Sequence, residues 1–222
     1  KNMKIKEHEN KELARQLSHP KGENGKQTGY SMNVANDNMI RNVIAQISVK
    51  ENSKILEIGP GNGKHIRYLF EINSGISYYG ADISELMVEE ATTLNSQLTA
   101  SGKAVFQLAD GEKLDYSDAF FTSIFTVNTL YFWKNPKEYL QKINRVLKPK
   151  GELIIGFIPK STMEKIPFSK YGFELYENED VQNLLEENNF SIDQTLSQTE
   201  EVLSNARDKK IRTFTIIKAL KK

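Results

Sequence analysis

Three glycines at alternate positions, Gly59, Gly61 and Gly63, form the most informative pattern in the sequence. The apolar segment before them, 55–58, has the branched side chains of a buried strand, and apolar residues follow at helical spacing over 66–70. Strand, glycine turn and helix together are typical of a crevice that binds a nucleotide-like ligand. Glycine suits such a turn because a side chain would hold the backbone away from the ligand, and tight turns often require φ > 0. An ordinary glycine-rich turn is the alternative interpretation.

Two acidic residues accompany the glycines. Glu57 precedes the first glycine by two positions, and Asp82 follows a second predicted strand, 77–81. An acidic residue about 20 residues beyond the glycine turn, at the end of the next strand, is placed to accept hydrogen bonds from ribose hydroxyls. The neighbouring Ile83 would lie at the same site. The alternative for Asp82 is a favourable charge at the start of the next helix, which Ser84 would cap.

The spacing of these residues resembles that of class I S-adenosylmethionine-dependent methyltransferases. A dinucleotide fingerprint needs G-x-G-x-x-G, whereas here the third glycine comes one residue early and Lys64 occupies the position of the last glycine. The pattern E-x-G-x-G-x-G over 57–63 instead resembles motif I of these methyltransferases. The resemblance implies that Glu57 and the three glycines belong to a cofactor site, with the glycine turn against the methionine part of S-adenosylmethionine.

Two further turns carry the same resemblance. A third predicted strand, 104–108, leads into Asp110, Gly111 and Glu112. The family commonly uses an acidic residue here to bind the adenine amino group, beside backbone that binds a ring nitrogen. A turn aspartate before glycine is also common for structural reasons. The segment 145–151 resembles the R-x-L-K-P-G-G junction of the family, with one substitution.

Aromatic residues follow the predicted central strand, 121–127, where a methyl acceptor is expected. In open α/β sheets, ligands bind beyond the carboxyl ends of the strands, at the point where strand order reverses. We therefore expect Asn128 at the cofactor, and Tyr131 and Trp133 in an acceptor pocket. Packing of these aromatics under a loop is an equal alternative. The loop-rich segment 159–177 is the other candidate for lining the acceptor pocket.

The N-terminal residues, 1–33, are polar and form a predicted arm before a single domain, 34–222. We expect a surface helix over 1–15, a loop over 19–25, and a helix over 34–47 whose apolar face packs on the sheet. Related small-molecule enzymes often use such an arm as a lid over the cofactor and acceptor. The residues of the arm expected to contact the acceptor are Tyr30, Met32 and Asn33.

The C-terminal part contains a predicted helix over 178–188 and two predicted strands, 191–197 and 212–219. They match the final antiparallel hairpin of the methyltransferase family. The resemblance therefore predicts an α/β fold: a Rossmann-like, seven-stranded, mostly parallel sheet with helices on both faces and a C-terminal antiparallel strand.

Composition agrees with an ordinary globular domain. The 222 residues include 38% hydrophobic residues, and 30 basic residues nearly balance 29 acidic ones. This balance gives no reason to expect nucleic acid as a partner. The absence of cysteine excludes disulfides and thiolate chemistry. No apolar stretch approaches a membrane span, and the N-terminus lacks a signal-peptide core, so we expect a cytoplasmic protein without a membrane span.

The predicted function is transfer of a methyl group from S-adenosylmethionine to a small molecule, as in the branch around ubiquinone and menaquinone methyltransferases. No convincing general base emerges: His8 and His19 lie in the arm, and the direction of His65 after the glycine turn is open. Three scattered histidines supply neither a catalytic triad nor a metal site. The alternatives are a non-catalytic binding protein with the methyltransferase fold and a nicotinamide-dependent oxidoreductase, against which the early third glycine argues.

Overall fold

The computed structural model describes residues 2–109, 113–203 and 209–222, and seven strands in these ranges form one sheet with the order β3-β2-β1-β4-β5-β7-β6. The predicted adenine-binding residues Asp110, Gly111 and Glu112 lie outside the described residues. The strands are β1 (Lys54–Ile58), β2 (Ser77–Asp82), β3 (Ala104–Leu108), β4 (Phe121–Val127), β5 (Leu147–Phe157), β6 (Phe190–Leu203) and β7 (Lys209–Lys221).

Strands β1 to β5 pair in parallel, whereas β7 lies antiparallel between β5 and β6. The chain runs from β1 outward through β2 to β3 and then returns to the other side of β1 with β4. The strand order therefore reverses between β1 and β4, which places a ligand crevice beyond their carboxyl ends. The predicted mostly parallel sheet with an antiparallel C-terminal strand is confirmed.

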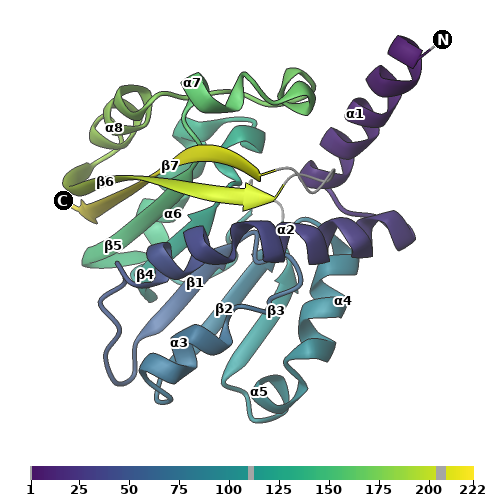
Figure 1. Ribbon diagram of the computed structural model, residues 1–222. Coiled ribbons are helices and arrows are strands. Elements are labelled where there is room, and N and C mark those ends of the chain that lie inside the picture. Colours follow the sequence, from purple (N-terminus) through teal and green to yellow (C-terminus); the bar gives the residue numbers. More distant parts are fainter. Residues whose placement is uncertain (1, 110–112, 204–208) are drawn as a thin grey trace.

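Helices cover both faces of the sheet. In Figure 1, α2 runs across the front of the sheet and α6 lies behind it, while α1 extends away beyond the end of α2. The helices are α1 (Asn2–Ser18), α2 (Gly22–Ile44), α3 (Arg67–Ile72), α4 (Glu85–Leu94), α5 (Ser96–Ala100), η1 (Leu130–Phe132), α6 (Pro136–Val146), α7 (Lys160–Met163), η2 (Pro167–Lys170) and α8 (Asn178–Glu186). None of the helices within the described ranges has the length and hydropathy needed to span a bilayer.

The predicted loop over 19–25 is wrong beyond its first residues, because α2 already begins at Gly22 and continues through the expected boundary between residues 33 and 34. Its glycines permit close packing. A Cβ atom at Gly25 would lie 2.9 Å from the Pro20 carbonyl carbon, and one at Gly29 would lie 2.8 Å from Met87 Sδ. Helix α2 therefore passes close to the preceding loop and to α4, and the sequence needs glycine there for contact rather than for a turn.

The C-terminal hairpin extends beyond both predicted strands, since β6 and β7 together cover most of 190–221. Contacts with α2 support its far end. Asn38 Nδ2 donates to Glu200 Oε2 at 2.7 Å, and Arg212 donates to the carbonyl oxygen of Ala35 at 2.9 Å. Arg212 also pairs with Glu200 at 2.6 Å. These hydrogen bonds from Asn38 and to Ala35 join residues 162 and 177 positions apart, so the local pattern could not predict the length of the strands.

A buried carboxylate joins the end of α2 to the sheet. Glu152 on β5 accepts hydrogen bonds from the backbone and hydroxyl of Ser48, from Ser123 Oγ at 3.2 Å, and from Lys218 Nζ at 2.8 Å. Burial alone would raise the pKa of Glu152, but the hydrogen bonds from Lys218 and Ser48 lower its pKa overall. The carboxylate thereby stabilises the joint between α2, β4, β5 and β7.

We expect Glu152→Gln to lower the free energy of unfolding by about 1.5–3 kcal/mol at neutral pH, because charge-assisted hydrogen bonds are lost and Lys218 loses its ion-pair partner. A group whose pKa is lowered by folding stabilises the protein above its unfolded pKa, and that contribution disappears as the pH falls through its folded pKa. The difference between wild type and variant should therefore shrink below about pH 4.5. Urea denaturation from pH 3 to pH 7 measures it, with the exposed Glu186→Gln as control. A difference in free energy of unfolding that stays constant from pH 3 to pH 7 would contradict the lowered pKa of Glu152.

Candidate active site

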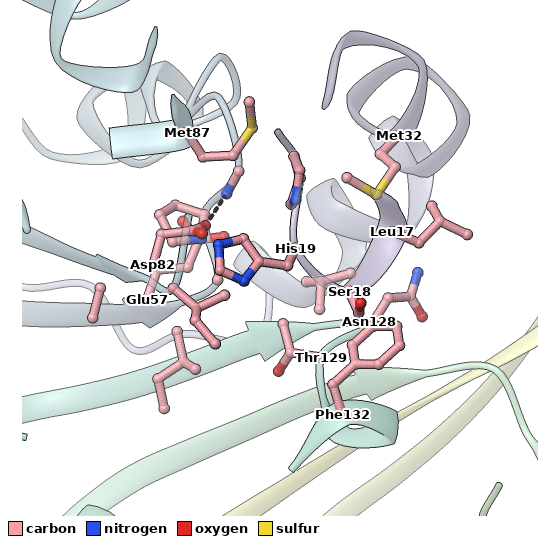
Figure 2. Close-up of a pocket in the computed structure, with 18 of the residues that line it drawn as sticks. Leu17, Ser18, His19, Met32, Glu57, Asp82, Met87, Asn128, Thr129 and Phe132 are labelled. Atoms are coloured by element: carbon pink, nitrogen blue, oxygen red, sulfur yellow. Dashed lines mark hydrogen bonds between the residues drawn. The ribbon is translucent and has the colours of Figure 1, made fainter. Parts of the chain in front are cut away.

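A cavity of about 450 Å³ lies at the carboxyl ends of β1, β2 and β4. Helices α1 and α2 and the loop between them form its outer wall. Figure 2 shows Glu57, Asp82 and Met87 on one side of this cavity, and Leu17, Met32, Asn128 and Phe132 on the other. The crevice predicted from the reversal of strand order is therefore a cavity covered by the N-terminal helices.

All three glycines of the turn have left-handed backbone, but only Gly59 and Gly61 line the cavity. Gly59, Gly61 and Gly63 have φ of +71°, +57° and +63°. A Cβ atom at Gly59 would lie 2.5 Å from Thr129 Cγ2, whereas one at Gly61 would meet no atom of the described residues within 4 Å. Gly63 does not line the cavity, and a Cβ atom there would contact Phe106. Gly61 thus keeps part of the cavity open, while Gly63 serves packing rather than the predicted ligand contact.

Asp82 lies at the end of β2, and its carboxylate fixes the glycine turn. Its Oδ2 accepts from the backbone N–H of Gly61 at 3.0 Å, and its Oδ1 accepts from that of Ser84 at 2.9 Å. The residue is 6% exposed, and burial raises its pKa to about 6 although both backbone bonds oppose the shift. Each oxygen keeps a lone pair that a ligand hydroxyl can use. Ile83, the next residue, lines the same wall.

Glu57 is 2% exposed and its carboxylate is occupied by protein partners. His65 Nε2 lies 2.8 and 2.9 Å from its two oxygens, and the Tyr78 hydroxyl donates to Oε2. His65 Nδ1 in turn lies 3.2 Å from Asn33 Nδ2 on α2. Both nitrogens of His65 are therefore engaged. Glu57 holds the turn, β2 and α2 together at the floor of the cavity, and burial followed by the charge of Glu57 raises the pKa of Tyr78.

The expectation that Tyr131 lines an acceptor pocket is wrong. Tyr131 is 2% exposed, and its hydroxyl donates to Asn128 Oδ1 at 2.8 Å and accepts from the backbone N–H of Ile158 at 2.6 Å. The tight turn of η1 directs this ring into the core. Phe132 and the predicted Trp133 line the cavity instead, and so does the predicted Asn128, which adopts a φ of +57°.

The N-terminal segment contributes to the wall in a different way from the prediction. Met32 and Asn33 line the cavity as expected, but Tyr30 is 58% exposed, and its ring centroid lies 5.1 Å from Lys64 Nζ outside it. The wall contains further residues that no sequence pattern indicated. Those from the N-terminal segment and α2 include Leu17, Ser18, His19 and Pro20, together with Asn36 and Ile40.

Comparison with known proteins agrees with this geometry. Residues 56–155 match the family described as "Methyltransferase domain". This range includes the glycine turn, the end of β2 and the strand β4. The resemblance to class I S-adenosylmethionine-dependent methyltransferases is therefore confirmed at the level of similarity: residues 56–155 match the methyltransferase family, and the curated relatives named below are methyltransferases.

Curated relatives include several O-methyltransferases. The chain is 28% identical over 169 residues to "O-methyltransferase resE" from Aspergillus sclerotiorum, a match that covers 73% of this chain and 64% of the relative. It is also 28% identical over 110 residues to the "27-O-demethylrifamycin SV methyltransferase" of Amycolatopsis mediterranei, covering 50% of this chain and 40% of the relative. The chain thus spans less than two thirds of the length of these relatives.

Solved structures show the same fold. An S-adenosylmethionine-dependent methyltransferase from Methanosarcina mazei superposes with a TM-score of 0.60 at 21% identity, covering 82% of this chain and 96% of the other. The "[4+2]-Cyclase SpnF" superposes with a TM-score of 0.67 at 19% identity, covering 83% and 80%. The fold is therefore shared by proteins whose names describe different reactions.

The raised pKa of Asp82 gives a pH dependence of known sign. Its pKa of about 6 exceeds the ordinary 3.8, so the folded protein binds more protons at Asp82 than the unfolded chain between these values. The free energy of unfolding of wild type should therefore fall relative to Asp82→Asn as pH rises from about 4 to about 6, and the difference should be constant above. Thermal or urea unfolding across this range measures the difference. Asp118→Asn, which removes one charge at an exposed ion pair, is the control. A free energy of unfolding of wild type that rises with pH relative to Asp82→Asn would refute the raised pKa of Asp82.

Proposed function

We propose that the chain is an S-adenosylmethionine-dependent methyltransferase that acts on a small molecule by in-line displacement at the methyl carbon. The observation that carries the proposal is the open backbone of Gly61, which faces the cavity and is fixed by the Asp82 carboxylate. The family match over 56–155 and the O-methyltransferase relatives support it. A hydroxyl oxygen is the acceptor atom that these relatives suggest.

The residues of the cavity fit the cofactor. The turn from Gly59 to Gly61 would lie against its methionine part, Asp82 would accept from its ribose hydroxyls, and Ile83 and Asn128 would complete the site. When bound, the cofactor supplies a methyl group that its sulfonium has already activated. The protein therefore needs mainly to align the acceptor and exclude water, and alignment alone can supply about 7–11 kcal/mol of such a barrier.

The N-terminal segment, 1–33, acts in this proposal as the lid of the cavity. Leu17 and Met32 from this segment face Phe132 across the acceptor side, so the walls there are largely apolar. An acceptor with an apolar skeleton and a hydroxyl group fits such walls, because apolar surface is favourably removed from water.

Two other functions are less well supported. A nicotinamide-dependent oxidoreductase would be expected to have the G-x-G-x-x-G spacing and a last strand parallel to its neighbours, whereas β7 here is antiparallel. A protein that keeps the methyltransferase fold without transferring methyl groups is the second alternative. The cyclase named among the solved structures illustrates that the fold alone does not define the reaction.

Calorimetric titration with S-adenosylmethionine and, separately, S-adenosylhomocysteine tests the proposal first. We expect both to bind, and we expect methyl transfer to some member of a panel of phenols and other hydroxylated aromatic molecules. Binding without transfer to any member would favour the non-catalytic alternative. Failure of a folded chain to bind either compound would overturn the proposed cofactor site.

Gly61→Leu should abolish or strongly weaken this binding while the protein stays folded, because the side chain would enter the open part of the cavity. Steric overlap commonly costs about 1–3 kcal/mol, or roughly tenfold to a hundredfold in affinity. Gly102→Leu is a matched control, since Gly102 also has positive φ (+73°) and its added Cβ would meet nothing within 4 Å in the described ranges, but it lies outside the cavity. Both variants carry similar backbone strain, so calorimetry on the pair separates strain from occlusion. Equal loss of affinity in both would contradict the assignment of Gly61.

A further inference from the structure

His19 lies in the wall of the cavity, where its imidazole faces the space between the two sides. It belongs to the loop between α1 and α2, and the ring is half-buried. Figure 2 shows His19 between the side that carries Asp82 and Glu57 and the side that carries Thr129 and Phe132. Within the described ranges of the chain, no group hydrogen-bonds its imidazole nitrogens. A polar ring in this position is available to a ligand.

The backbone on both sides of His19 is anchored. Its own N–H donates to the carbonyl oxygen of Arg15 at 3.0 Å, and the next carbonyl, that of Pro20, accepts from Ser84 Oγ at 2.6 Å. The N–H of Lys21 donates to Gln16 Oε1 at 2.9 Å. Ser84 is fully buried and also bonds Asp82 through its N–H. The loop therefore holds His19 at a fixed place relative to the carboxylate that marks the cofactor side of the cavity.

The charges around His19 favour a neutral imidazole. Burial, and then the positive charges of Lys21 and Arg15, lower the pKa of His19 below its ordinary value of 6.5. From the sheet side, the carboxylates of Asp82 and Glu57 line the same cavity and would favour the charged form, but burial and the two positive charges outweigh them. A neutral imidazole has one nitrogen with a free lone pair, which is the form a base requires. His65 cannot take this part, because both of its nitrogens are already engaged.

We propose that His19 is the general base that accepts the proton of an acceptor hydroxyl group during methyl transfer, an inference that rests on the function proposed above. The acceptor oxygen forms its bond to the methyl carbon as the bond from that carbon to sulfur breaks, with the bonding electron pair left on sulfur. The hydroxyl proton passes to His19 and from there to water. The favoured substrates are neutral phenols or alcohols that need this deprotonation.

Two histidine variants form the main test. His19→Asn keeps a polar side chain of similar reach but removes the base, and His8→Asn changes an exposed histidine of α1 outside the cavity. We expect His19→Asn to lower kcat/KM for weakly acidic phenols by about 10²- to 10⁴-fold. The loss should shrink as the phenols become more acidic, because an acceptor that is already ionised needs no base. His8→Asn should behave as wild type. An equal loss for every phenol, or no loss, would overturn the role as a base.

A measurement without turnover separates this inference from the proposed function. The protein is mixed with S-adenosylhomocysteine and 4-nitrophenol, whose ionisation is visible by absorbance. Wild type should ionise a larger fraction of bound 4-nitrophenol than His19→Asn does, because the protonated imidazole and the phenolate form an ion pair in the cavity. The same absorbance in both proteins would refute the role of His19. Wild type that binds the cofactor product but methylates no acceptor would instead contradict the proposed function, while the absorbance result shows separately whether His19 accepts a phenol proton.

Discussion

The buried carboxylate of Glu57 is the interaction on which the arrangement of the cavity depends. A carboxylate at 2% exposure is costly unless hydrogen bonds or charges compensate it, and here His65 and Tyr78 supply those bonds. These partners come from the helical side of the glycine turn and from β2, and His65 continues the chain of contacts to Asn33 on α2. Satisfying one buried charge therefore brings together β1, β2, the glycine turn and the helix that covers the cavity.

The glycine turn is then held from two directions. Glu57 fixes the end of the turn that leads into α3, through its hydrogen bond with His65. Asp82 fixes the middle of the turn by accepting from the N–H of Gly61. With the backbone fixed in the left-handed region, Gly61 presents open space where any other residue would place a side chain. The two carboxylates thus have different tasks. Both residues line the cavity, but protein partners occupy the Glu57 carboxylate, whereas the Asp82 carboxylate has acceptor capacity left for a ligand.

The local sequence pattern predicted much of the sheet, but it did not predict how α1, α2 and the loop between them cover the cavity. The apolar strand 55–58, its glycine turn and Asp82 could be recognised because short-range spacing determines them. His19 could not, because its place depends on the bond between Pro20 and Ser84, which are 64 residues apart. The prediction that Tyr131, after β4, lines the acceptor pocket was wrong for a related reason. Whether Tyr131 or Phe132 faces the cavity depends on the phase of one tight turn, and the hydrogen bonds of Tyr131 to Asn128 and Ile158 fix that phase only in the folded chain.

The sheet and the N-terminal cover contribute different residues to the cavity. The proposed cofactor contacts come from the carboxyl ends of β1 and β2, whereas Leu17 and Met32 come from α1 and α2 and His19 from the loop between them. Ser84 couples the two parts: its N–H bonds Asp82, its hydroxyl accepts from the N–H of Met87 at the start of α4, and the same hydroxyl donates to the Pro20 carbonyl. One buried hydroxyl thereby sets the position of His19 relative to Asp82. The proposed base therefore lies on a cover that the carboxyl edge of the sheet itself holds in place.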